Sequence, residues 1–274
     1  MQLLSIQMAA LPNRLHAAVR RTREMVYALY AQAVFRLLAV LIGVSVITLP
    51  GKRLRWALLR PFARSLAWLT ATRFKVGGIK NLLPEKQNCI YVVNHASFLD
   101  SYTVCAALPR RFRFTAKSDL AKKWLPANFL GRIGTLFVDR FDPARALAST
   151  QSVEQAAILG DSLLFFPEGT FTYAPGLRPF RMGAFVTTAS LQLPVIPVAL
   201  HGTRAILQGN SWVAHRGSIT VTFGQAIDPQ SLAEACDSEW ETVLKLRDLA
   251  RGQILRHCGE ADLGHEQAIP PHQQ

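Results

Sequence analysis

The segment IYVVNHASFLD, residues 90–100, joins an apolar run to a polar turn. Residues 90–93 are β-branched or aromatic, as is typical of a buried strand, and Asn94 and His95 follow directly. Asp100 comes five positions after His95. Polar side chains at the carboxyl ends of strands are where α/β proteins collect their sites. The segment therefore predicts an α/β fold with a candidate site at the edge of its sheet.

The two polar side chains of this segment suit general-base chemistry. Across a turn into a helix, Asp100 can accept a hydrogen bond from one ring nitrogen of His95, which leaves the other nitrogen to take a proton from an alcohol. No serine in a G-x-S-x-G turn is present, so the nucleophile would be the substrate's own hydroxyl. The same spacing also fits a capping Asp beside a hydrogen-bonded structural His.

The rest of the chain alternates short apolar runs with helical stretches, which predicts a mixed central sheet flanked by helices. Helices are expected at Pro143–Leu159 and Leu232–His257, and residues 259–274 are expected to form a disordered tail. A catalytic domain would then cover residues 74–258. The expected strands are Cys89–Val93, Phe112–Ala116, Thr135–Val138, Ser162–Phe166, Val195–Leu200 and Ile219–Phe223.

Residues 1–73 are basic and apolar and are expected to anchor the protein to a membrane. The most apolar part, Val34–Pro50, has basic residues on both sides, so both ends prefer the same membrane face. This symmetry favours a helical hairpin in one leaflet, with its turn near Pro50, over a helix that spans the bilayer from Ala28 to Leu49. The following stretch, Leu54–Thr72, reads as an interfacial helix or as an ordinary core-facing one.

Composition supports an anionic membrane as partner. The chain has 274 residues, 31 Lys and Arg against 18 Asp and Glu, and 50% hydrophobic residues. Its mean hydropathy of +0.16 is high for a soluble enzyme. No nucleic-acid-binding motif appears, and the four scattered cysteines lack the spacing of a metal site. We expect reduced thiols, no metal, and a location on the cytoplasmic face of a bacterial inner membrane or its equivalent.

A second motif, FFPEGT at residues 165–170, again ends an apolar run in a turn with a carboxylate, a glycine and a hydroxyl. Together with NHxxxxD at 94–100, GTLFVDR at 134–140 and VIPVAL at 195–200, in this order, the chain resembles the glycerolipid acyltransferase family of the HxxxxD type. The resemblance covers residues 76–223.

The resemblance implies roles for particular residues. His95 would be the general base and Asp100 its orienting partner. The other implied residues would bind the acceptor or shape its pocket: Lys117, Gly134, Phe137, Arg140, Glu168, Gly169 and Thr170. The sequence departs from the family pattern at Phe171, where an Arg is usual. Arg178 or Arg181 would supply the missing guanidinium.

The implied reaction moves a fatty acyl group from acyl-CoA or acyl-carrier protein to the hydroxyl of 1-acyl-glycerol-3-phosphate, which gives phosphatidic acid. No cofactor is needed, because a thioester is already activated. The departure at Phe171 leaves open another lysolipid acceptor, such as lyso-ornithine lipid. A third reading is a noncatalytic lipid-binding module at the membrane, which would have no need of a base.

Overall fold

The computed structural model describes residues 2–139, 143–170, 174–209 and 211–265. In these residues seven strands form one sheet in the order β1-β7-β6-β2-β5-β3-β4. Neighbouring strands run parallel, except for the antiparallel pair β6 and β7, so the predicted mixed sheet is confirmed. The strands are β1 Arg73–Gly77, β2 Ile90–Val93, β3 Arg113–Lys117, β4 Leu136–Val138, β5 Leu163–Phe165, β6 Val195–His201 and β7 Ser218–Phe223.

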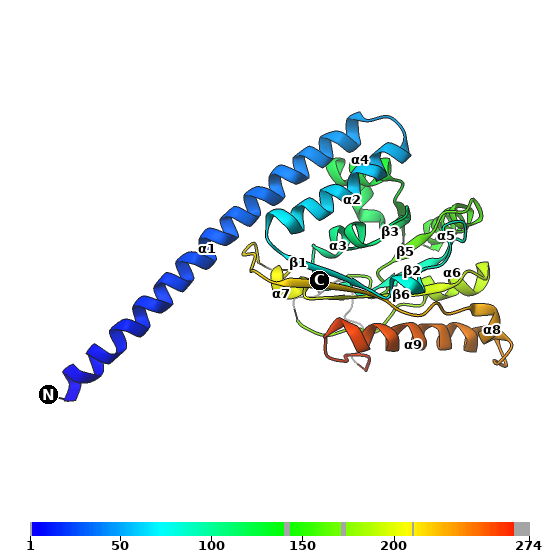
Figure 1. Ribbon diagram of the computed structural model, residues 1–274. Coiled ribbons are helices and arrows are strands. Elements are labelled where there is room, and N and C mark those ends of the chain that lie inside the picture. The colour runs from blue at the N-terminus through cyan, green and yellow to red at the C-terminus, as the bar shows by residue number, and fades with distance from the viewer. Residues whose placement is uncertain (1, 140–142, 171–173, 210, 266–274) are drawn as a thin grey trace.

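Helices cover both faces of the sheet (Figure 1). On one face lie α2 Lys52–Leu69, α3 Asp100–Ala107 and α4 Trp124–Ile133, and on the other α5 Pro143–Ile158, α6 Gly183–Leu191 and α9 Glu239–Cys258. Shorter helices are η1 Ile79–Asn81, η2 Ser118–Lys122, α7 Thr203–Ile206 and α8 Pro229–Ala233.

Strand β2 shows how the sequence builds these layers. All four of its residues are fully buried. Tyr91 and Val93 pack into the core beneath α2 and α3, whereas Ile90 and Val92 pack into the core beneath α6 and α9. Alternate side chains point to opposite faces of a strand. A run that is apolar at every position therefore requires helices on both sides of the sheet.

The N-terminal region forms the expected helical hairpin. Helix α1 runs from Gln2 to Thr48, and the turn at residues 49–51 leads into α2, with Gly51 at a positive φ of 74°. The amino-terminal part of α1 projects from the domain (Figure 1). By length and composition, residues 16–48 could cross a membrane. The helix begins much earlier than Ala28, the start expected for a spanning segment.

The second half of α1 is attached to the domain by side-chain hydrogen bonds. The Tyr27 hydroxyl donates to the carbonyl of Thr70 at 3.0 Å, and the Gln32 amide donates to the carbonyl of Trp212 at 2.7 Å. Helix α2 buries Leu59 and Ala63 in the core that also holds residues of α3. The core-facing interpretation of α2 is therefore confirmed for this face of the helix.

Three sequence expectations need correction. Strand β1, Arg73–Gly77, was not expected. The single helix expected over Leu232–His257 is divided between two helices, α8 and α9. Ser238 caps α9 by accepting a hydrogen bond from the N–H of Glu241, and the Glu241 carboxylate accepts one from the N–H of Asp237. This reciprocal capping starts a new helix.

The third correction concerns the tail. Glu260 pairs with Arg204 at 2.8 Å and accepts from the N–H of Gly176 at 2.6 Å, and Asp262 pairs with Arg251. The carboxyl-terminal segment therefore stays on the domain at least to Asp262, rather than leaving it at Gly259. Residues 266–274 of the expected tail lie outside the described residues.

Helix α9 offers a test of the core. Leu246 is fully buried against the sheet, whereas Leu249 on the same helix is 46% exposed. L246A should lower the free energy of unfolding by about 2–5 kcal/mol, since it removes buried methyl groups and leaves a cavity. L249A should change it by less than about 1 kcal/mol. Equal losses in denaturant unfolding of the two detergent-solubilised variants would contradict this packing.

Candidate active site

His95 lies in the loop that follows β2 at the carboxyl edge of the sheet. The preceding residue fixes this loop to the neighbouring strand β6: the Asn94 amide donates to the carbonyl of Leu200 at 3.0 Å, and its side-chain oxygen accepts from the N–H of Leu200 at 2.7 Å. Asn94 is buried. The side chain thus acts as one more rung between β2 and β6, and it places the next residue, His95, at the end of the sheet.

Asp100 holds the His95 ring in a defined orientation. One carboxylate oxygen, Oδ2, lies 2.8 Å from His95 Nδ1 and also accepts from the backbone N–H groups of Ala96 and Ser97, at 2.6 and 2.8 Å. Asp100 is fully buried in the first turn of α3, where the helix dipole favours a negative charge. It therefore both caps the turn and pairs with the imidazole. With Nδ1 as donor, the tautomer that can accept a proton at Nε2 is favoured.

Phe166 supports the other side of the imidazole. Its ring lies 4.2 Å from the His95 ring, centroid to centroid, at an interplanar angle of 23°. The His95 side chain keeps 17% of its surface exposed. The imidazole is thus held by a carboxylate at its edge and an aromatic ring on its face, while part of it remains open to the adjoining cavity.

Glu168 ties the second motif to the first. Its carboxylate accepts from the backbone N–H of His95 at 2.7 Å and from that of Arg178 at 3.0 Å. Burial, opposed by these two hydrogen bonds, raises the pKa of Glu168 from 4.5 to about 7. Glu168 is 5% exposed and is not among the residues that line the cavity. In this structure it positions the loops around His95 instead of facing an acceptor.

The cavity beside His95 has a volume of about 840 Å³. Its lining includes His95, Lys117, Gly169, Thr170 and Arg181. Its walls are apolar side chains of the N-terminal hairpin and of α4: Phe35, Leu38, Ile42, Leu59, Phe62, Leu66, Phe129, Leu130 and Ile133. The hairpin expected to serve as an anchor therefore also forms the walls of the site. The apolar sequence predicted the helices of the hairpin, but it did not predict that they would enclose the cavity beside His95.

The predicted substrate-binding residues divide into two groups. Lys117, Gly169, Thr170 and Arg181 line the cavity. Arg178 is buried away from it, and Gly134 ends α4 with a φ of 88°, where it also does not line the cavity. Arg140 lies outside the described residues.

Lys117 sits at the rim of the cavity and is half-exposed. Its ammonium pairs with Asp119 at 2.7 Å, and Lys122 pairs with the same carboxylate at 2.9 Å. Hydrogen bonds from these two lysines lower the pKa of Asp119 to about 2. Lys117 would have to exchange this partner to reach an anionic substrate.

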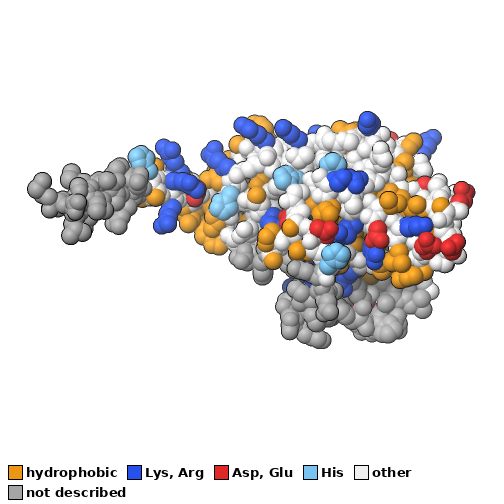
Figure 2. All heavy atoms as spheres, turned by 90° about the horizontal axis from the view of Figure 1, so that it is seen from below, with side chains coloured by type: hydrophobic (Ala, Val, Ile, Leu, Met, Phe, Trp, Pro, Cys, Tyr) orange, Lys and Arg blue, Asp and Glu red, His pale blue; other side chains and the backbone are white. Residues whose placement is uncertain are grey.

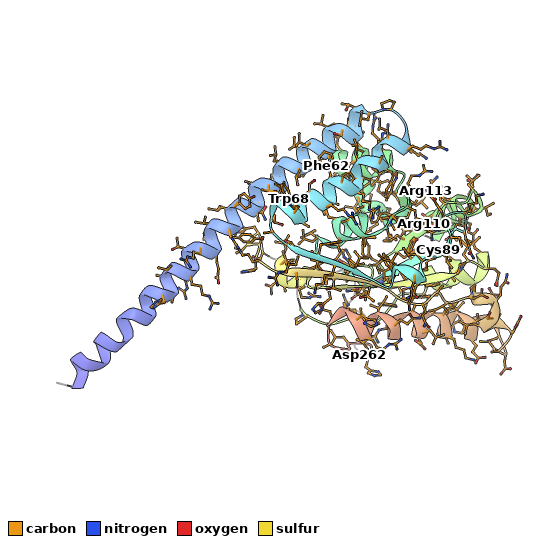
Figure 3. All side chains as sticks on the ribbon, in the orientation of Figure 1. Phe62, Trp68, Cys89, Arg110, Arg113 and Asp262 are labelled. Atoms are coloured by element: carbon orange, nitrogen blue, oxygen red, sulfur yellow. The ribbon has the colours of Figure 1, made fainter. Side chains whose placement is uncertain are left out.

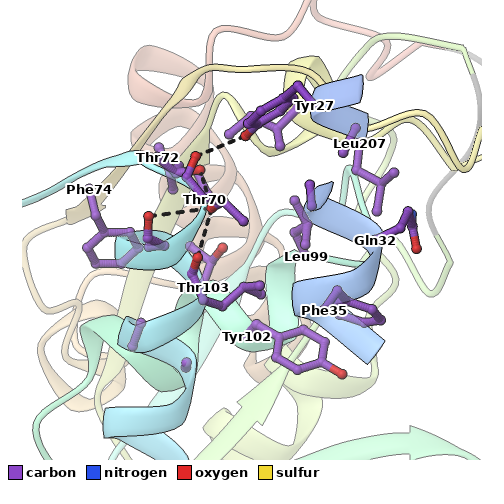
Figure 4. A pocket seen from close by; sticks show the side chains of 18 residues that line it. Tyr27, Gln32, Phe35, Thr70, Thr72, Phe74, Leu99, Tyr102, Thr103 and Leu207 are labelled. Carbon is purple, nitrogen blue, oxygen red and sulfur yellow. Dashed lines mark hydrogen bonds between the residues drawn. The ribbon is translucent and has the colours of Figure 1, made fainter. Parts of the chain in front are cut away.

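A second, smaller cleft adjoins the cavity where α1, α2 and α3 meet (Figure 4). Its volume is about 60 Å³, and its lining is mostly apolar. Phe35, Leu66 and Tyr102 line both spaces. The hydrogen bond from Tyr27 to Thr70 lies at one edge of this cleft, at the top of Figure 4. Among the described residues, no group of three His, Cys, Asp or Glu side chains could hold a metal ion.

Comparison with known families finds related proteins. A family model described as Acyltransferase matches residues 73–201, which include both site motifs. A chloroplastic 1-acyl-sn-glycerol-3-phosphate acyltransferase of Brassica napus is 30% identical over 163 residues, 59% of this chain and 47% of that protein. The 1-acyl-sn-glycerol-3-phosphate acyltransferase of Saccharomyces cerevisiae is 29% identical over 231 residues, 82% of this chain and 74% of that protein. The chain spans about half the length of the plant and algal relatives that it matches.

The fold also has a counterpart among solved structures. The crystal structure of the 1-acyl-sn-glycerophosphate acyltransferase PlsC from Thermotoga maritima superposes with a TM-score of 0.69 at 18% sequence identity. The superposition covers 86% of this chain and 97% of that one. The two chains therefore share their fold, including most of the region outside the matched family model.

The raised pKa of Glu168 predicts a pH dependence of stability. Folding favours the protonated form of the Glu168 carboxyl. The contribution of this group to the free energy of unfolding is therefore complete below about pH 4.5 and is lost as the pH rises towards 7. E168Q removes this titration. Between about pH 5 and about pH 7.5 its free energy of unfolding should fall less than that of wild type. E234Q, at an exposed position, is the control and should follow wild type. An equal fall in E168Q and wild type would show that Glu168 is not the titrating group.

Proposed function

We propose that the chain is a glycerolipid acyltransferase that transfers a fatty acyl group to the free hydroxyl of 1-acyl-glycerol-3-phosphate. The donor would be acyl-CoA or acyl-carrier protein. The observation that carries the proposal is the His95–Asp100 pair, 2.8 Å apart, with His95 lining a cavity whose other lining residues include two basic side chains and many apolar ones. A noncatalytic lipid-binding module would not require an oriented base beside its pocket.

The proposed reaction is a direct transfer. Nε2 of His95 accepts the proton of the acceptor hydroxyl as the oxygen attacks the thioester carbonyl. The new oxygen–carbon bond forms, the carbon–sulfur bond breaks, and the proton passes from the imidazolium to the departing thiolate. Asp100 stabilises the imidazolium through Nδ1. The thioester is already activated, so no metal or organic cofactor enters this scheme.

The basic residues that line the cavity suit an acceptor that carries phosphate. Arg181 and Lys117 line the same cavity as Thr170 and His95. A guanidinium and an ammonium there can bind phosphate oxygens while the acceptor hydroxyl approaches the imidazole. In this arrangement Arg181 supplies the positive charge that the family pattern has directly after Thr170, where this chain has Phe171.

We propose that the outer face of α1 lies in the membrane interface. Apolar side chains recur there at helical spacing and are strongly exposed: Val26, Leu29, Leu37, Val40 and Val44 are each 55–63% exposed. The view from below shows Lys and Arg side chains on the projecting part of α1, and acidic side chains mainly over the middle and the far end of the domain (Figure 2). A basic helix with an unpartnered apolar stripe suits an anionic bilayer surface. The cytoplasmic face is the proposed location.

The catalytic part of the proposal is tested by H95A. Loss of the base should lower acyl transfer to lysophosphatidate by at least about 100-fold. H257A, at an exposed position on α9, is the matched control and should keep wild-type activity. Labelled acyl-CoA and acyl-carrier protein are compared as donors. Lyso-ornithine lipid is assayed in parallel. Turnover of the ornithine lipid alone would contradict the proposed acceptor, and full activity of H95A would contradict the proposed base.

The membrane part is tested by vesicle flotation. Replacing both Leu37 and Val40 by Gln should weaken binding to anionic vesicles by about 10- to 100-fold, because two exposed apolar side chains would no longer enter the bilayer. L249Q changes an exposed leucine on α9 and should bind like wild type. Binding that is unaffected by the double substitution would place the membrane contact elsewhere.

A further inference from the structure

A second group of basic residues lies on and beside α2, and none of these residues lines the catalytic cavity. They line a groove of about 380 Å³ between α2 and the connection from α3 to β3. Arg53 and Arg60 of α2 line it from one side, and Arg110 and Arg111 line it from the other. No Asp or Glu is among its lining residues in the described part of the chain. Cys105 lines both this groove and the catalytic cavity.

Three of these arginines have no compensating partner. Among the described residues, Arg53, Arg60 and Arg111 make no ion pair and no hydrogen bond, whereas nearby Arg113 pairs with Asp161 at 2.6 Å. The Nε of Arg60 is buried without an acceptor. Burial and the neighbouring Arg64 lower the pKa of the Arg60 guanidinium. A bound anion would give this buried donor an acceptor and would reduce the repulsion between the cations.

Hydrogen bonds hold two of the groove's lining side chains, Arg110 and Trp56, in place. Arg110 donates to the hydroxyl of Tyr91 at 2.8 Å and to the carbonyls of Pro84 and Gln87 at 2.9 and 3.0 Å. Trp56 donates its indole N–H to the carbonyl of Ile133 at 2.9 Å. Arg110 also donates to the Sγ of Cys89 at 3.4 Å, and Figure 3 labels both residues in the part of the domain to the right of α2. One guanidinium is thus fixed in place, while Arg53 and Arg111 are exposed and can close on a ligand.

The chemistry of the groove points to phosphate. Guanidinium groups bind phosphate oxygens through paired hydrogen bonds. The volume is within the range of sites for whole small molecules, so a ligand larger than a lone phosphate would fit. Trp56 and Pro61 provide apolar surface for the rest of such a ligand. We propose that this groove binds the phosphate group of a larger ligand, either a phospholipid headgroup or a nucleotide.

The proposal does not depend on the acyltransferase reaction, because it concerns binding alone. The position of the groove is compatible with both sources of phosphate. Arg53 lies in the first turn of α2, next to exposed Leu54 and directly after the hairpin turn, where a lipid headgroup could reach it. The nucleotide end of an acyl donor could also reach a groove that adjoins the catalytic cavity at Cys105.

Calorimetric titration of the full-length protein in neutral detergent tests the groove. One probe is phosphatidylglycerol in mixed micelles, and the other is adenosine 3′,5′-bisphosphate. R60Q and R111Q should each weaken binding of at least one probe by about tenfold, because each removes a phosphate-binding fork. The probe that is affected identifies the source. R256Q, an exposed arginine at the end of α9, removes the same charge outside the groove and should bind like wild type.

Two outcomes would overturn the groove as a phosphate site. One is that neither probe binds to wild type, and the other is that R60Q and R111Q bind both probes as tightly as R256Q does. Because Arg111 is exposed, R111Q should fold normally even if R60Q does not. Acyl transfer is measured on the same preparations. Absence of transfer with intact, arginine-dependent binding would count against the proposed reaction only.

Discussion

The hydrogen bond between His95 and Asp100 is the contact on which the site depends, and the surrounding structure holds it in place. Asn94 fastens the loop to β6, and Glu168 accepts from the backbone N–H of His95. The Asp100 carboxylate accepts from two backbone N–H groups as well as from the imidazole. The turn, the helix start and the imidazole are therefore one hydrogen-bonded unit at the end of a buried parallel strand.

The sequence predicted this unit well because its signals are local. An apolar run followed by Asn94 and His95 defines a strand end, and six of the seven strands lie where apolar runs predicted them. Strand β1 was missed because Arg73 and Lys75 interrupt its apolar pattern. It lies at the edge of the sheet, where β7 is its one neighbouring strand in the described part of the chain. The break before α9 was detectable, since Ser238 and Glu241 form a capping pair.

Long-range geometry could not be predicted in the same way. Glu168 belongs to a motif that suggests substrate contact, yet it is buried between two backbone N–H groups from separate loops. Arg178 and Arg181 are three residues apart, and only Arg181 reaches the cavity. Which of two neighbouring arginines faces a ligand depends on how the segment after Thr170 packs, and no periodicity encodes that. The same holds for Phe35 and Phe62, which line the cavity from the N-terminal hairpin of α1 and α2.

Direct transfer through an oriented imidazole is the central claim, and intact-protein mass spectrometry after incubation with acyl-CoA alone tests it most directly. The predicted result is an unchanged protein mass, with coenzyme A released only after the lysolipid acceptor is added. A covalent acyl adduct that forms without acceptor and disappears when the acceptor is supplied would contradict the account. The nucleophile would then be a side chain of this protein and not the hydroxyl of its substrate.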